Sequence, residues 1–111
     1  MTNDAKKVLF GLYKEYFDKI SHGFTRKDSK YFGSSTDIQQ EFFPEMYPED
    51  IEDILFELSS LGLVDNIEAS GSIYSCSLSS KGISVFEDLP KNSLKTFISF
   101  AFEIVKLVPN H

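Results

Sequence analysis

The stretch PEDIEDILFELSSLGLV, residues 48–64, predicts a helix that leads directly into a β-strand. Pro48 suits the first helical position because its missing amide hydrogen would have no partner there. The apolar residues behind it recur at spacings of three and four, which is typical of one buried helix face. They are Ile51, Ile54, Leu55, Leu58 and Leu61. Gly62 suits the C-terminal cap, so we predict that the helix ends beside it.

The segments after this helix predict a β-hairpin and a further short helix. Residues 63–68 and 73–78 are rich in β-forming side chains, and residues 69–72, ASGS, supply a turn glycine between them. Ser79 or Ser80 is suited to cap a short helix after the second strand. Cys76, within the second strand, is expected to be a small, half-buried residue.

The N-terminal segments predict a long helix and a short strand. Apolar residues at helical spacing mark a helix over residues 4–20, and His22-Gly23 ends it. The polar residues 24–29 predict a loop, and residues 30–33 predict a short strand.

A second helix is predicted between this strand and Pro48. Thr36 and Gln39 fit a capping box, in which each side chain satisfies a free backbone amide. We therefore expect the helix to begin at Thr36 and to run to about Phe43.

A last helix is predicted after Pro90, with Asn92 or Ser93 as its cap and its end near Val108. The helix would be apolar over more of its circumference than one packing partner covers, which favours a homodimer. The predicted dimer interface is Leu94, Phe97, Phe100, Ala101, Ile104, Leu107 and Val108. The alternative is that this face is closed within one subunit.

Length and composition favour one cytoplasmic domain. The chain has 111 residues, of which 41% are apolar and 25% charged, and this suits a single modest core over residues 1–111. Residues 4–89 would form its main body and residues 92–108 the added helix. The most apolar stretch, residues 94–108, contains three charged residues and is short for a bilayer, so no membrane contact is expected.

Charge is distributed unevenly along the chain. The net charge is −6, yet residues 1–31 carry +3 and residues 32–111 carry −9. No lysine or arginine occurs between Tyr31 and Lys81. A partner of the middle of the chain is therefore expected to be basic.

Two passages resemble known families. The stretch LGLV at 61–64, followed by YSCSLSSKGISVF at 74–86, resembles bacterial winged helix-turn-helix regulators. In those proteins a strand ending in Leu-Thr meets a Lys-Gly pair that opens the next helix, and here Ser79 stands in place of the threonine. The final helix after LPKNS at 89–93 is similar to the ending of the small YjcQ-like winged-helix proteins of bacteria and their mobile elements.

The resemblance covers residues 4–89 and implies a fold class and a function. The fold would be α+β and mainly helical, a winged helix-turn-helix with a β-hairpin wing and an added C-terminal helix. The function would be transcription regulation, with the helix at residues 48–61 contacting DNA. Winged helices also serve as protein-interaction modules, so the fold alone does not decide the function.

The residues on the outward face of this helix are unsuited to DNA contact. Arg, Lys, Asn or Gln normally read guanine and adenine, and none lies between Pro48 and Asp65. The hairpin tip also lacks a cation for phosphate. We therefore predict that this face binds a basic protein partner; the alternative is a solvated face that binds nothing. The candidate partner-binding residues are Glu49, Glu52, Asp53, Phe56 and Glu57.

Two details of this prediction leave alternatives open. Phe56 lies off the apolar stripe, and it is either an exposed anchor for the partner or packs under the hairpin or the second helix. The basic residues Arg26, Lys27 and Lys30 could contact phosphate, which gives the alternative function of a DNA-binding regulator. They could equally be solvated surface residues.

Enzymatic activity, a bound metal and a cofactor are not expected. His22 lies beside a helix-ending glycine, and no serine is framed by glycines as a hydrolase nucleophile would be. Cys76 is the single cysteine and His22 and His111 are the only histidines, so no ligand set for structural zinc exists. The acids around Glu49 lack the spacing and glycine of an EF-hand loop.

Overall fold

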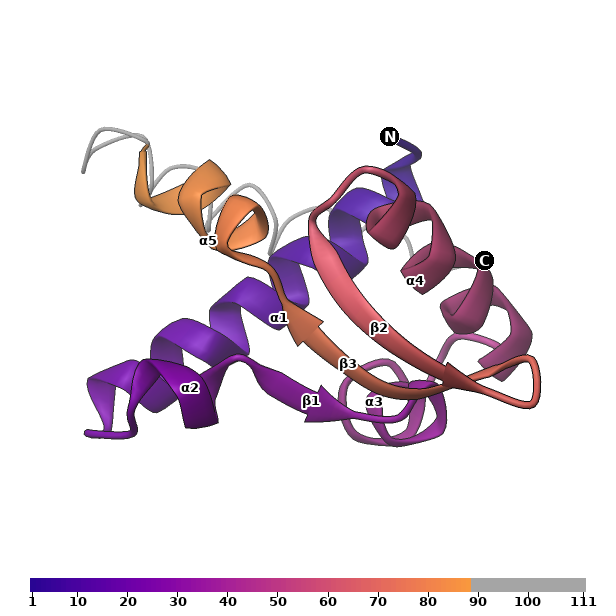
Figure 1. The fold of residues 1–111 in the computed structure, drawn as a ribbon, viewed down its shortest axis with the longest axis horizontal. Helices are drawn as coiled ribbons and strands as arrows, with labels where there is room; N and C mark the ends of the chain where they lie inside the picture. Colours follow the sequence, from indigo (N-terminus) through magenta and orange to yellow (C-terminus); the bar gives the residue numbers. More distant parts are fainter. Residues whose placement is uncertain (89–111) are drawn as a thin grey trace.

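A computed structural model describes residues 1–88 of the chain. The predicted last helix and its dimer interface, from Leu94 to Val108, lie outside the described residues. Within residues 1–88 the protein is α+β and mainly helical, as predicted, with a small antiparallel sheet (Figure 1). The elements are α1 (Asn3–Ser21), α2 (Arg26–Ser29), β1 (Tyr31–Gly33), α3 (Ser35–Phe42), α4 (Pro48–Ser60), β2 (Val64–Ala69), β3 (Ser72–Leu78) and α5 (Ser80–Glu87).

Two local predictions were wrong: a short helix was missed, and the start of another helix was misplaced. The predicted loop over residues 24–29 contains α2, because the Thr25 hydroxyl accepts a hydrogen bond from the Asp28 amide and caps a single helical turn. Helix α3 begins before Thr36, because Ser34 and Asp37 form its capping box. The predicted capping partner Gln39 instead donates to the Met46 carbonyl at 2.9 Å.

The three strands form a sheet in the order β1-β3-β2, with antiparallel neighbours. The hairpin turns at Ser70 and Gly71, whose φ angles are 55° and 81°. Positive φ at both positions is characteristic of the tight hairpin turn whose twist matches the flanking strands. The ladder between β2 and β3 shifts register between Ile67 and Glu68, where Tyr74 is the extra residue of β3.

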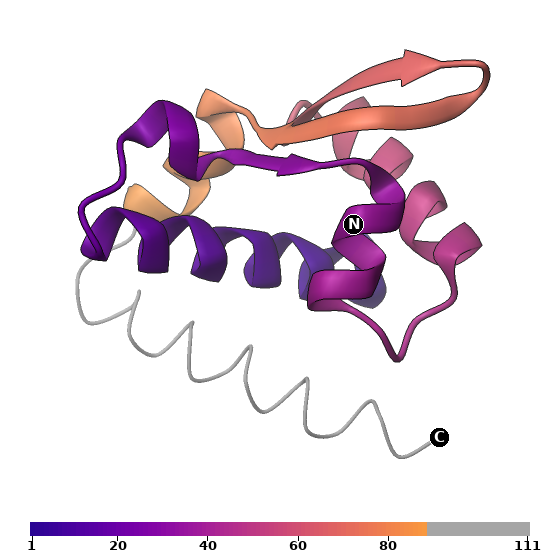
Figure 2. The same cartoon turned by 90° about the horizontal axis from the view of Figure 1, so that it is seen from below.

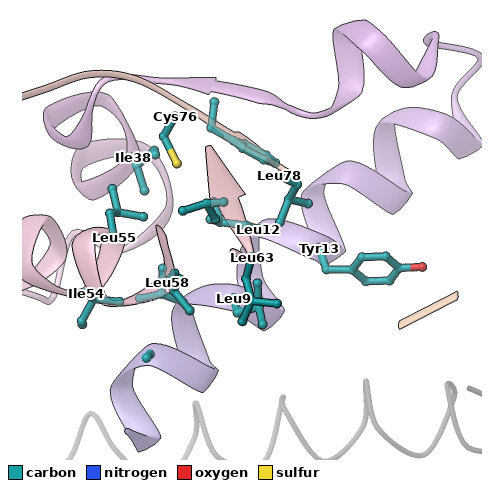
Figure 3. Packing of buried hydrophobic residues seen from close by; sticks show 14 of the residues in the cluster. Leu9, Leu12, Tyr13, Ile38, Ile54, Leu55, Leu58, Leu63, Cys76 and Leu78 are labelled. Carbon is teal, nitrogen blue, oxygen red and sulfur yellow. The ribbon is translucent and has the colours of Figure 1, made fainter. Parts of the chain in front are cut away.

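The core lies between one face of the sheet and the helices. Figure 2 shows α1 and α3 on the same side of the sheet, and α4 packs against α1, α3 and β2. Leu12, Leu55 and Leu78, from α1, α4 and β3, meet in this core (Figure 3). Cys76 points into the same cluster and is fully buried, rather than half-buried as the sequence predicted.

The segment that opens α5 ties this helix to the turn between α4 and β2. The Ser79 hydroxyl accepts from the Gly82 amide at 2.9 Å and donates to the Gly62 carbonyl at 2.6 Å. Lys81 Nζ donates to the Leu61 carbonyl at 3.0 Å, where α4 ends. A Cβ on Gly82 would lie 2.1 Å from the Leu63 carbonyl oxygen, so this helix can approach so closely only with glycine there.

Candidate protein-binding surface

Helix α4 has one buried face and one acidic face. Ile51, Leu55 and Leu58 are fully buried against the rest of the core, as the apolar stripe predicted. Glu49, Asp50 and Asp53 are exposed. The first two lie in the first turn, where their charge also complements the positive end of the helix dipole.

An exposed tyrosine completes this surface. Tyr47 immediately precedes α4, and 74% of its surface is accessible to solvent. Tyr47 and Asp50 are three residues apart, Asp50 and Asp53 likewise, and Glu49 and Asp53 are four apart, so neighbouring members lie on adjacent turns. We call Tyr47, Glu49, Asp50 and Asp53 the acidic surface of α4. None of its three carboxylates forms an ion pair within residues 1–88.

The sequence did not identify Tyr47 as a candidate. Its place between Pro44 and Pro48 was no sufficient signal, because Met46 in the same turn packs against the core. Glu45, the nearest acid before Tyr47, is not part of this surface, because its carboxylate forms an ion pair with the buried Lys7 at 3.1 Å.

Two of the predicted partner-binding carboxylates accept hydrogen bonds from other parts of the domain. Glu52 accepts a hydrogen bond from the Ser35 hydroxyl of α3 at 2.9 Å. Glu57 accepts from the Thr2 amide at 2.9 Å and from the Thr2 hydroxyl at 3.1 Å. Both carboxylates are half-buried. Their hydrogen bonds link α4 to α3 and to the start of α1.

Phe56 is half-buried and packs against the core cluster. It is therefore less accessible than the exposed-anchor hypothesis assumed. The exposed aromatic residue beside the acids of α4 is Tyr47.

We expect Phe56→Ala to lower the free energy of unfolding by about 1–3 kcal/mol. A fully buried phenylalanine costs about 3–5 kcal/mol on truncation, and the half-buried ring should lose a part of that. Tyr47→Ala is the matched control, because an exposed side chain changes stability by less than about 0.5 kcal/mol. Urea unfolding of the three proteins measures both effects. A loss for Phe56→Ala no larger than that of the control would restore the exposed-anchor hypothesis.

The three candidate phosphate contacts lie away from the acidic surface. Arg26 and Lys27 are exposed on α2, and Figure 1 shows α2 and α4 on opposite sides of the molecule. Lys30 is half-buried, and its Nζ lies 5.7 Å from the centre of the Tyr31 ring. The basic group and the acidic surface are thus separate.

The hairpin tip carries no cation. Asp65 and Glu68 are exposed on β2, and the turn itself is made by Ser70 and Gly71. The side-chain amide of Asn66 in β2 donates to the Leu55 carbonyl at 3.0 Å and fastens the hairpin to α4. Both elements expected to approach nucleic acid therefore present negative charge.

A shallow hollow of about 430 Å³ lies where α1, α2 and α5 meet, and the sequence did not predict it. It is lined by Tyr13, Tyr16, Phe17, Ile20, Arg26 and Glu87. Burial raises the pKa values of both tyrosine hydroxyls, and the charge of Glu87 raises them further. Histidine, cysteine and serine are absent from this lining.

Two further findings concern the part of the chain that the structure describes. Within residues 1–88, no three His, Cys, Asp or Glu side chains gather where they could hold a metal ion. No helix in this range has the length and apolar character needed to cross a membrane.

Comparison of the chain with models of protein families, with curated proteins and with solved structures found no match.

Proposed function

We propose that the chain is a non-enzymatic winged-helix protein, similar to transcriptional regulators, whose acidic surface on α4 binds a basic segment of a protein partner. The observation that carries the proposal is the set of exposed carboxylates Glu49, Asp50 and Asp53 beside the exposed ring of Tyr47. The order of the elements, the hairpin after α4 and the contacts of Ser79, Lys81 and Gly82 support the winged-helix assignment.

The chemistry of this surface suits lysine and arginine. Three carboxylates on adjacent turns can each accept charge-assisted hydrogen bonds from a cationic side chain. The face of a tyrosine ring attracts the same cations and offers apolar area for their methylene stems. An aromatic residue ringed by charge is also a common anchor of protein interfaces.

The same surface opposes the phosphate backbone of DNA. Non-specific affinity for duplex DNA comes from cations that displace condensed counterions, and the outward face of α4 offers none. The net charge of −6 adds long-range repulsion. We therefore infer that α4 does not read the major groove.

The test measures two labelled probes by fluorescence anisotropy. We expect a short peptide rich in lysine and arginine to bind, and a mixed-sequence DNA duplex to show no salt-sensitive binding. The double variant Glu49→Gln, Asp53→Asn should weaken peptide binding about tenfold, because both contacts with the peptide lose their charge. The control Glu68→Gln, Asp88→Asn removes the same charge from exposed sites elsewhere and should change it less than about twofold.

A DNA-binding regulator that uses its basic N-terminal region is the second candidate, favoured by the exposure of Arg26 and Lys27 on α2. It predicts micromolar duplex binding that weakens steeply between about 50 and 200 mM salt. Loss of that binding in Arg26→Ala, Lys27→Ala would establish this candidate and reject the first. Equal peptide affinity in the two double variants would also reject the first, since binding would then follow net charge alone.

A further inference from the structure

The outer face of the sheet, turned away from the core, exposes one large apolar side chain from each strand. Tyr31 of β1 is 45% exposed, Ile67 of β2 60% and Tyr74 of β3 70%. Figure 2 shows α1 and α3 on the opposite face, and no helix of residues 1–88 covers this one. Exposed apolar side chains gathered on one face can mark an interface.

Strand pairing places a charged residue on the same outer face. Ser77 of β3 pairs with Tyr31 on one side and with Asp65 on the other. Directly paired residues point to the same side of a sheet, so these three form one row across it. Burial agrees, since Phe32 and Val64, the neighbours of the outer residues along each strand, are buried.

A cation lies at the opposite end of this row from Asp65. Lys30 precedes β1, and its Nζ is held 5.7 Å from the centre of the Tyr31 ring. The aromatic contact keeps the ammonium group beside the outer face at the β1 edge. The row therefore begins at β1 with the Lys30 ammonium group beside the Tyr31 ring, continues at β3 with Ser77, and ends at β2 with the Asp65 carboxylate.

We propose that a second copy of this chain docks on the outer face of the sheet, related by a two-fold axis that runs parallel to β3. Such an axis reverses the order of the strands, so β1 of one copy lies over β2 of its partner. Lys30 then faces Asp65 of the second copy, and the same contact occurs twice. The face carries a positive charge at one edge and a negative charge at the other, so two copies related by this axis bring opposite charges together. This favours a second copy over a uniformly basic or acidic partner.

The apolar side chains fit the same arrangement. Strand β1 pairs with β3 only at Tyr31 and Gly33, so beyond Gly33 the face narrows to β2 and β3. The two-fold axis places Ile67 of the second copy over the part of the face that β1 leaves open beyond Gly33, beside Tyr74. Ser77 at the centre of the row is small and buried, so the larger exposed side chains around it would make the contact.

The size of the face indicates weak association. Strands about 4.8 Å apart with a rise of about 3.4 Å per residue give on the order of 300–400 Å² per copy. Stable complexes bury about 800 Å² per partner, so we expect dissociation constants of about 0.1–1 mM. This association is independent of the proposed binding by the acidic surface of α4, which lies outside the contact.

The experiment is sedimentation equilibrium up to about 1 mM chain, where an interface of this size should be populated. We expect the unchanged protein to dimerise, and Lys30→Glu and Asp65→Lys each to weaken dimerisation at least about tenfold through two like-charge contacts. An equimolar mixture of the two variants should recover dimers, because both contacts again join opposite charges. Tyr74→Glu, at a 70% exposed position, should also weaken the dimer, and circular dichroism verifies that each variant is folded.

Three outcomes would overturn the proposal. The first is a monomer over the whole concentration range, and the second is a mixture of the charge variants that stays monomeric. The third is a dimer that Tyr74→Glu and both charge variants leave intact but Phe100→Glu dissociates. That result would assign dimerisation to the interface predicted over residues 94–108.

Discussion

Gly82→Ala is expected to lower the free energy of unfolding by about 3 kcal/mol or more, although alanine is the better helix former. The added Cβ would lie 2.1 Å from the carbonyl oxygen of Leu63, and the backbone must shift to relieve that overlap. The Leu63 carbonyl also accepts a hydrogen bond from the Ser79 amide at 3.1 Å. Any shift therefore disturbs the cap of α5 and the start of β2 together.

Ser80→Ala is the matched control for this substitution. Ser80 is the first residue of α5, is exposed, and should change stability by less than about 0.5 kcal/mol. Urea unfolding of the three proteins gives the comparison. If the close approach were unimportant, Gly82→Ala would gain up to about 1 kcal/mol from helix propensity, so the sign of the effect decides.

The elements that the sequence predicted well are those with a local physical cause. Helix α4 starts at Pro48 because proline fixes the backbone of a first turn without losing a hydrogen bond. The hairpin forms around Gly71 because its turn requires positive φ. Ser79, one of two predicted caps, caps α5 because it can also reach the Gly62 carbonyl.

The helix caps that were mispredicted had competing local solutions. Gly33 has a φ of 87° and turns the chain immediately after β1, which brings Ser34 rather than Thr36 to the cap position. The sequence offers two pairs of cap and partner there, Ser34 with Asp37 and Thr36 with Gln39. Only the path of the preceding strand selects between them.

The sequence predicted only part of the candidate site, because the rest depends on contacts between different elements. Helical periodicity separates buried from outward positions, and it correctly placed Glu49 and Asp53 in solvent. It cannot identify donors from other elements, so it could not foresee the bonds of Glu52 to Ser35 or of Glu57 to Thr2. The pairing of Tyr31 in β1 with Ser77 in β3, on which the outer-face contact depends, joins distant parts of the chain and likewise had no local signal.

Stability in alkali should depend on Cys76. Burial raises the pKa of this thiol from 9.0 to about 12, and the charge of Asp65 contributes to the shift. The folded protein therefore keeps the thiol protonated where the unfolded chain ionises it. The resulting stabilisation is fully present below about pH 9 and is lost as the pH rises toward 12.

The expected loss is large over a narrow range. One proton released on unfolding lowers the free energy of unfolding by about 1.4 kcal/mol for each pH unit above the unfolded pKa. A three-unit shift gives about 4 kcal/mol by pH 12, and about 1.4 kcal/mol is already lost between about pH 8 and pH 10. The pKa values of Tyr13 and Tyr16 are also raised from 10.0, so their contribution adds to this loss as the pH approaches and passes 10.

Urea unfolding of the unchanged protein and of Cys76→Ala, followed between about pH 8 and pH 10, isolates the thiol because both proteins carry the same tyrosines. The variant should start less stable at pH 8, since a fully buried side chain is shortened. Its stability should then fall by about 1.4 kcal/mol less than that of the unchanged protein over this range. Parallel curves would mean that the thiol ionises equally in both states, and hence that Cys76 reaches solvent without unfolding of β3.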